Sequence, residues 1–348
     1  MSEEINLVRS LRLQANACRT LGSPFSGALL DRAAEDWLAG GPVRPLLAPW
    51  EEAGLKALFE AAAPLRLLGA LHDLALSGED TGLAEAYGRL DAPAAWTAAV
   101  VAMADERERL SRFMAHEPQT NEVRRSICLV GGFLEVVRAS GLPLRCFEIG
   151  ASAGLNLSWD RFRYDFGTAR WGDADSSLRL DTDWQGSAPA VEAGVEVVER
   201  AACDRRPVDL TDPAGRQRLL AYVWPDQTER LARARAAIDL ALAEGVSVEA
   251  GDAPAWTAGR VAPRVGTATV LYHSVFWQYM PTPSQTALRQ AIEDIGARAS
   301  AAAPFAWLSM EPGRDDVTIM EIRLRLWPGG EARVLGECHP HGAWVRWR

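Results

Sequence analysis

Apolar residues change their spacing along the chain near Pro143. From residue 5 to about 140 they recur at intervals of three and four positions, and glycine or proline marks the ends of the runs, as in amphipathic helices. After Pro143 short apolar runs alternate with helix-like segments, which is typical of a parallel α/β sheet. The pattern therefore predicts an all-α N-terminal region over 1–118 and a Rossmann-like, mostly parallel sheet domain over 119–348.

The second region also has a definite order of expected elements. Its predicted strands lie near residues 144–149, 196–203, 246–250, 267–273 and 304–310. Its predicted helices lie near residues 154–163, 213–223, 227–244 and 283–298. Two extended stretches, 317–327 and 332–347, flank a Pro-Gly-Gly turn and predict a C-terminal antiparallel hairpin. Residues 160–194 interrupt the alternation and predict an irregular or hairpin insertion.

Composition narrows the class of protein. The chain has 348 residues, 48% of them hydrophobic, so it can build a large core. A formal net charge of −9 argues against a broad nucleic-acid-binding surface. Five scattered cysteines without CxxC spacing predict neither a zinc site nor a disulfide framework. The same cysteine pattern favours the reduced cytosol, so we expect a cytoplasmic protein. No long apolar run is present, so we expect no membrane segment.

The strongest candidate for a ligand-binding site is the run of small residues from Gly150 to Gly154, which follows the strand predicted at 144–149. Small residues let a ligand approach the backbone, and a helix beginning there would offer free N–H groups to an anionic ligand. The alternative is that these residues only permit close packing between a strand and a helix.

Glu148, Gly150 and Gly154, with an acidic residue after the second predicted strand, resemble the cofactor-binding start of class I S-adenosylmethionine-dependent methyltransferases. The resemblance implies a turn that holds the methionine part, Asp204 at the ribose and Asp252 at the adenine. The cofactor-binding residues that it implies are Glu148, Gly150, Ala151, Ser152, Gly154, Asn156, Asp204 and Asp252.

The spacing differs from that of an uninterrupted Rossmann-type unit. Asp204 follows Gly154 at far more than the roughly 20 residues that are usual, and the insertion at 160–194 would explain the gap. Otherwise Asp181 or Asp183 is the alternative ribose partner. No helix is expected between the fifth predicted strand and the terminal hairpin, where the standard fold of this class has one.

Four segments are similar to a bacterial family that is known only as a domain of unknown function, and the similarity spans nearly the whole chain. The resemblance indicates an architecture and implies no activity. The segments are 119–126, 148–157, 160–164 and 223–227.

The same turn also matches G-x-S-x-G, the nucleophile elbow of a serine hydrolase. Ser152 would be the nucleophile in that case. The acid would be Asp252 or Glu311 and the base His339 or His341. Only helices precede the turn, whereas the hydrolase fold places strands before it. A third possibility is a protein that binds a nucleotide or cofactor without catalysis.

Residues after the fourth and fifth predicted strands are candidates for the acceptor side of the pocket. Tyr272 and His273 are candidate catalytic residues, because a histidine has a near-neutral pKa suited to proton transfer. Trp277, Tyr279 and Glu311 are candidate substrate-binding residues.

Three further groups are expected to be structural. Asn121, Glu122 and Arg125 are expected on a solvated helix face, and the alternative is that their side chains reach the turn at Gly150 to Gly154. Asp226 is expected to cap the helix that follows it. The acidic residues of the insertion lack the spacing of a calcium loop, so we expect a charged surface and no metal.

These observations together predict an S-adenosylmethionine-dependent methyltransferase that acts on a small or medium-sized acceptor. Its partner would be a small-molecule substrate, with no nucleic acid and no membrane.

Overall fold

A computed structural model describes residues 5–348, and the chain divides into two compact units. The first unit comprises the chain up to Thr120 together with residues 212–235. The second unit comprises residues 121–211 and 236–348. The segment 212–235 thus belongs with the N-terminal helices, although it lies between strands of the second unit in the sequence.

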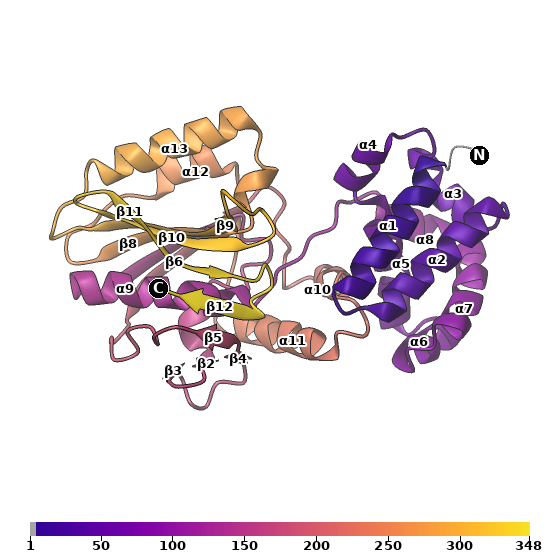
Figure 1. The fold of residues 1–348 in the computed structure, drawn as a ribbon, viewed down its shortest axis with the longest axis horizontal. Helices are drawn as coiled ribbons and strands as arrows, with labels where there is room; N and C mark the ends of the chain where they lie inside the picture. The colour runs from indigo at the N-terminus through magenta and orange to yellow at the C-terminus, as the bar shows by residue number, and fades with distance from the viewer. Residues whose placement is uncertain (1–4) are drawn as a thin grey trace. The chain divides into compact units, whose positions relative to one another are not determined.

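The first unit is entirely helical (Figure 1), as the spacing of its apolar residues predicts. Buried leucine and alanine residues from its helices form one core, and Ala221 and Tyr222 are part of it. Its helices before residue 121 are α1(Asn6–Thr20), α2(Pro24–Leu38), α3(Val43–Leu47), α4(Leu55–Glu60), α5(Ala63–Ser77), α6(Thr81–Gly88), α7(Ala92–Asp105) and α8(Arg107–Met114), with the 3₁₀ turn η1(Ala48–Trp50). It also contains α10(Pro213–Ala221) and the start of α11(Thr228–Ala243).

Asp226 stabilises the start of α2 and not the start of its own helix. Its carboxylate accepts a hydrogen bond from the Ser23 hydroxyl at 2.5 Å and another from the Phe25 amide at 3.0 Å. Ser23 is the N-cap of α2, and its hydroxyl accepts from the Ser26 amide. The expectation that Asp226 caps the following helix is therefore wrong, because a distant helix start offers it two donors.

The second unit is built on a nine-stranded sheet in the order β5-β12-β11-β10-β9-β8-β1-β6-β7. The strands β7, β6, β1, β8 and β9 run parallel to one another, and β10, β11 and β12 continue from β9 as an antiparallel meander. The predicted fold class is thereby confirmed. The strands are β1(Leu144–Ile149), β5(Asp183–Gln185), β6(Val197–Asp204), β7(Glu249–Ala250), β8(Ala268–Ser274), β9(Phe305–Pro312), β10(Met320–Trp327), β11(Glu331–Cys338) and β12(Trp344–Trp347).

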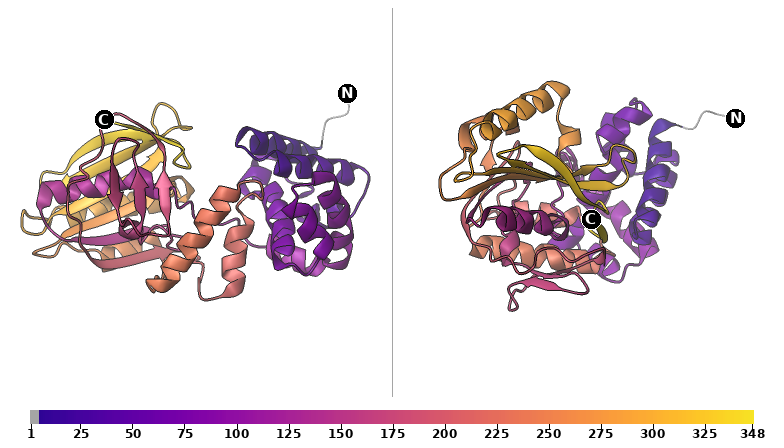
Figure 2. Two further views of the ribbon diagram at one scale, coloured as in Figure 1. Left: turned by 90° about the horizontal axis from the view of Figure 1, so that it is seen from below. Right: turned by 60° about the vertical axis from the view of Figure 1, so that its left-hand side comes forward.

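Helices cover both faces of this sheet. Figures 1 and 2 show α12(Ala253–Arg260) and α13(Thr282–Gly296) on one face and α9(Arg125–Ser140) on the other. The α9 helix lies close to the sheet because Gly132 has no side chain. A Cβ atom there would meet the Leu308 side chain of β9 at 2.3 Å.

The structure departs from the predicted elements in three places. The helix predicted at 154–163 is absent, and the chain forms turns that end in the 3₁₀ segment η2(Trp159–Arg161). The strand predicted at 246–250 is reduced to β7, and α12 was not expected. The insertion forms a separate three-stranded sheet of β2(Arg163–Asp165), β3(Arg170–Gly172) and β4(Arg179–Asp181), whereas β5 pairs with β12.

Within residues 5–348, none of the helices combines the length and apolar character that crossing a membrane requires. The same residues contain no group of three or more His, Cys, Asp or Glu side chains placed to hold a metal ion.

We predict that Asp226→Ala lowers the free energy of unfolding by about 1–2 kcal/mol, because the start of α2 loses two hydrogen bonds to a carboxylate. Chemical denaturation of the full chain measures the effect. Asp239→Ala is the matched control, because Asp239 is exposed on α11. Equal unfolding midpoints for the two variants would contradict this role.

Candidate functional site

The turn after β1 is held in an unusual backbone conformation. Gly150, Ser152 and Gly154 have φ values of 66°, 55° and 72°, which lie in the left-handed region. Glycine adopts this region freely, but a serine there needs support from its surroundings. The chain consequently reverses direction within a few residues at the carboxyl end of the central strand β1, and it does not continue as a helix.

Backbone and side-chain groups of β6 provide that support. The Ala151 amide donates to the carbonyl oxygen of Cys203 at 3.1 Å, and the Ser152 amide donates to Oδ2 of Asp204 at 2.9 Å. The other carboxylate oxygen of Asp204 accepts from the Arg206 amide at 2.9 Å. Asp204, the last residue of β6, is thus a direct hydrogen-bond partner of the turn.

The two alternative aspartates occupy other places. Asp181 ends β4 in the small sheet and pairs with Arg124, with 3.6 Å between the charged atoms. Asp183 begins β5 and accepts a hydrogen bond from the Gln185 side chain. The gap between Gly154 and Asp204 is accounted for by the insertion, and Asp204 is the acidic residue that contacts the turn.

Asp252 lies beside Asp204 at the next strand end. The Gly251 amide donates to the carbonyl oxygen of Asp204 at 2.9 Å, which holds the chain after β7 against the end of β6. Asp252 is the N-cap residue of α12, but its side chain makes no capping hydrogen bond and is exposed. Its carboxylate is therefore available to a ligand at the same edge of the sheet.

Buried polar side chains, chief among them Glu148 and Tyr272, lie beneath the turn and form the floor of the site. Oε2 of Glu148 accepts a hydrogen bond from the Tyr272 hydroxyl at 3.3 Å, and that hydroxyl also lies 3.4 Å from the carbonyl oxygen of Asn156. Burial raises the pKa of Glu148 from 4.5 to about 8, and the hydrogen bond from Tyr272 opposes that rise only in part. Glu148 is therefore mainly protonated at neutral pH, and burial also raises the pKa of Tyr272 well above its ordinary value.

The start of α9 is part of this site. The Leu155 amide donates to the Asn121 side chain at 2.9 Å, and the Ser126 hydroxyl donates to Oδ1 of Asn156 at 2.7 Å. Glu122 is only 4% exposed, and its carbonyl oxygen accepts from the Asn156 amide group at 3.3 Å. The expectation of a solvated face at Asn121, Glu122 and Arg125 is wrong, because the segment 152–158 folds over this helix start.

Arg125 also makes contacts inside the second unit. Its Nε atom donates to the carbonyl oxygen of Pro340 at 3.0 Å, and its terminal nitrogen lies 3.5 Å from the carbonyl oxygen of Ser274, at the end of β8. The positive charge of Arg125 acts against the rise in the pKa of Glu148. This arginine therefore links the floor of the site to the chain after β8.

His273, in β8, is 1% exposed, and both of its ring nitrogens are hydrogen-bonded. Nδ1 lies 2.6 Å from Oε1 of Glu311, and Nε2 accepts from the indole N–H of Trp307 at 3.0 Å. Because an indole N–H can only donate, we assign the ring proton to Nδ1. The same oxygen of Glu311 accepts from the Phe276 amide at 2.9 Å, so Glu311 also anchors the chain that follows β8.

That following chain carries an aromatic segment, residues 275–280, next to the turn. A Cβ atom at Gly150 would lie 2.1 Å from the ring of Phe276, so the ring covers this glycine closely. Val275 has a φ of 49°, which is strained for a β-branched residue. Trp277 is half-buried and stacks on His273, whereas Tyr279 is 72% exposed. Phe276 belongs to an aromatic run visible in the sequence, but its contact with Gly150 was not predicted.

The groups expected of a serine hydrolase are not assembled in the part of the chain that the structure describes. The hydroxyl of Ser152 is buried and has no hydrogen-bond partner there. Glu311 is bonded to His273, and Nδ1 of His339 accepts from the His341 amide at 3.0 Å. A nucleophile, a base and an acid in hydrogen-bond contact are thus not present around Ser152.

Comparison with known proteins identifies a family without an assigned function. A family model described as an uncharacterised protein conserved in bacteria, DUF2332, matches residues 8–347. No curated protein and no solved structure matches the chain.

We predict that Glu148→Gln removes a pH dependence of stability. Because the folded protein holds the Glu148 proton up to about pH 8 and the unfolded chain releases it near pH 4.5, the wild type loses stability as pH rises through this window. The loss is on the order of a few kcal/mol, and the variant should lack it.

Urea unfolding at several values between pH 5 and pH 8 measures this difference. Glu331→Gln is the control, because Glu331 is exposed and should leave the slope unchanged. Parallel pH profiles of the wild type and Glu148→Gln would show that the buried carboxyl group does not titrate in this way.

Proposed function

Because the chain belongs to the uncharacterised bacterial family DUF2332, whose description names no activity, we propose a function from its site: an S-adenosylmethionine-dependent methyltransferase with a small or medium-sized acceptor. The second unit would bind the cofactor along the carboxyl ends of β1, β6 and β7. The acceptor would lie at the ends of β8 and β9.

One observation carries this proposal. A left-handed turn follows the central strand β1, and two carboxylates lie at the ends of the next two strands outward: Asp204 is the last residue of β6, and Asp252 follows β7. From β1 the sheet continues to β6 on one side and to β8 on the other. Ligands of open α/β sheets bind outside the carboxyl ends of the strands at such a reversal of strand order.

The residues on the adenosine side fit the cofactor. Asp252 is exposed and makes no capping bond, so its carboxylate can accept hydrogen bonds from an amino group. Asp204 already accepts two backbone hydrogen bonds, but each carboxylate oxygen can accept a second one, and the residue is only half-buried. The two side chains could thus hold the adenine and the ribose respectively.

The methionine part of the cofactor fits beside the turn only if residues 275–280 change conformation. The Phe276 ring lies against Gly150, where the backbone of the turn would meet the ligand. The strained φ of Val275 immediately precedes this ring, and an alternative conformation of residues 275–280 would relieve that strain. Binding would therefore couple to a displacement of Phe276.

S-adenosylmethionine brings an activated methyl group, so the protein mainly has to position the acceptor. Trp277 and Tyr279 offer aromatic surface for an apolar or planar acceptor. His273 could receive a proton at Nε2 only after Trp307 releases that atom, and Glu311 would then stabilise the imidazolium. Tyr272 is bonded to Glu148, so it supports the floor of the site.

A serine hydrolase is the second candidate, because Ser152 has the strained left-handed backbone of a nucleophile elbow and its hydroxyl has no hydrogen-bond partner within residues 5–348. Labelling by a fluorophosphonate probe distinguishes it. Reaction that is lost in Ser152→Ala would favour the hydrolase, whereas the methyltransferase proposal expects no labelling at Ser152.

We predict that S-adenosylhomocysteine raises the thermal unfolding temperature of the full chain and that NAD does not. Asp252→Asn should weaken binding of this ligand by about tenfold or more, because one hydrogen bond to a charged acceptor is lost. Calorimetric titration measures the affinity. Asp315→Asn, which changes an exposed aspartate after β9, is the control. No binding, or equal affinity in both variants, would contradict the proposed site.

A second prediction concerns Phe276. Phe276→Ala should strengthen binding of S-adenosylhomocysteine severalfold, because the ring no longer has to leave Gly150. Tyr279→Ala is the matched control, since Tyr279 is an exposed aromatic residue of the same segment. Weaker binding in Phe276→Ala than in the control would mean that the ring contacts the ligand and does not obstruct it.

A further inference from the structure

The outer face of the small sheet β3-β2-β4 carries a set of charged side chains that is independent of the proposed function. Each strand has the pattern charged, apolar, then charged or glycine: Arg-Tyr-Asp, Arg-Trp-Gly and Arg-Leu-Asp. Tyr164 and Leu180, at the central positions of β2 and β4, are buried. The alternation of a strand therefore turns the flanking residues to the opposite, outer face.

The register of this sheet places like charges opposite each other. In the parallel pair β2 and β4, Arg163 is opposite Arg179 and Asp165 is opposite Asp181. Like charges at directly opposite positions destabilise a sheet unless other groups compensate them. The partners of these four side chains therefore show which of them form ion pairs.

The two carboxylates have cationic partners. Asp165 accepts from Nε of Arg170 at 2.7 Å, and Arg124 lies 3.6 Å from Asp181. The two arginines instead donate to neutral backbone oxygens: Arg163 to Gly172 at 2.7 Å and Arg179 to Ala174 at 3.1 Å. Within residues 5–348 neither of these two guanidinium groups forms an ion pair with an acid.

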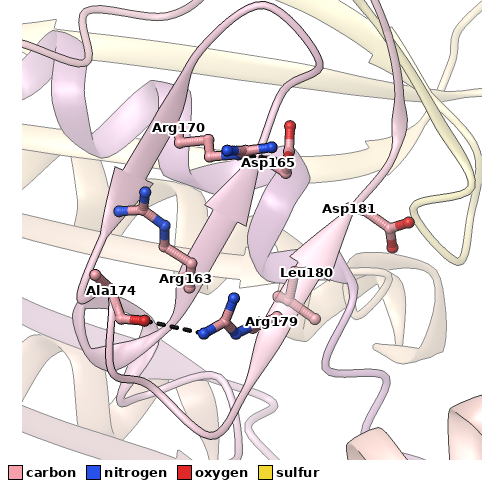
Figure 3. Close-up of a pocket in the computed structure, with 7 residues that line it drawn as sticks. All are labelled: Arg163, Asp165, Arg170, Ala174, Arg179, Leu180 and Asp181. Atoms are coloured by element: carbon pink, nitrogen blue, oxygen red, sulfur yellow. Dashed lines mark hydrogen bonds and ion pairs between the residues drawn. The ribbon is translucent and has the colours of Figure 1, made fainter.

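These side chains surround an open cavity of about 370 Å³, which is large enough for a phosphate group and a small organic group attached to it. Figure 3 shows Arg163 and Arg179 on its wall, Asp165 turned towards Arg170, and Asp181 turned away from the other labelled side chains. The hydrogen bonds to Gly172 and Ala174 fix the two guanidinium groups, and each still has N–H donors to offer.

We propose that this cavity binds a phosphate group between Arg163 and Arg179. Neither guanidinium group forms an ion pair within residues 5–348, although Arg163 acts on Asp165 electrostatically. Together the two groups can donate hydrogen bonds to several oxygens of one phosphate group, whereas a carboxylate has only two oxygens. Guanidinium groups form paired hydrogen bonds with phosphate oxygens. The anion would relieve the repulsion that the register of β2 and β4 creates.

Calorimetric titration of the full chain with inorganic phosphate, glycerol 3-phosphate and acetate, at matched ionic strength, tests this site. Arg163→Gln and Arg179→Gln should each weaken phosphate binding by about tenfold or more. Arg161→Gln is the matched control. It removes one positive charge from the same segment, but Arg161 pairs with Glu244 outside the cavity. Circular dichroism of each variant checks that the fold is retained.

Binding of either phosphate compound that is lost in both test variants and kept in the control would support the site. The stronger ligand of the two then identifies free phosphate or a phosphate monoester as the source. Absence of binding, an equal loss in all three variants, or acetate binding as tightly as phosphate would overturn the assignment.

Discussion

The hydrogen bond from the Ser152 amide to the Asp204 carboxylate connects the two strands on which the site is built. It holds a non-glycine residue in the left-handed region between two left-handed glycines, so the chain reverses immediately after β1. The Ala151 amide and the Ser152 carbonyl oxygen are also bonded, to Cys203 and Val208 respectively. Because β6 and the chain just after it hold the turn at these points, the turn keeps its shape without a following helix.

The floor beneath this turn is polar but largely uncharged at neutral pH. Glu148 stays protonated there because ionising it in a buried position costs more than its hydrogen bond from Tyr272 offsets. Asn156 ties the same floor to the start of α9 through Ser126 and the Glu122 carbonyl group. The exposed carboxylate of Asp252 is therefore at the edge of the site, where a ligand can reach it, and the carboxyl group of Glu148 is not.

Periodic patterns in the sequence predicted the main strands, the helical first region and the position of the turn, because these features depend on residues close together in the chain. The helix predicted at 154–163 does not form, since Leu155 and Asn156 bond to side chains of Asn121 and Ser126. The spacing of residues within a short segment cannot reveal hydrogen-bond partners that lie far away in the sequence. The same limit explains Asp226, whose partner Ser23 is 203 positions away, and the Phe276 ring against Gly150. The opposed arginines of β2 and β4 likewise became visible only with the strand register.

The proposed cofactor site lies at the carboxyl ends of β1, β6 and β7, with the Phe276 ring covering it. A crystal structure of the full chain grown with S-adenosylhomocysteine tests it most directly. The account predicts electron density for the ligand beside Asp204 and Asp252, with the Phe276 ring moved away from Gly150. Ligand density at another place, or a Phe276 ring still against Gly150 with no ligand beside the turn, would contradict it.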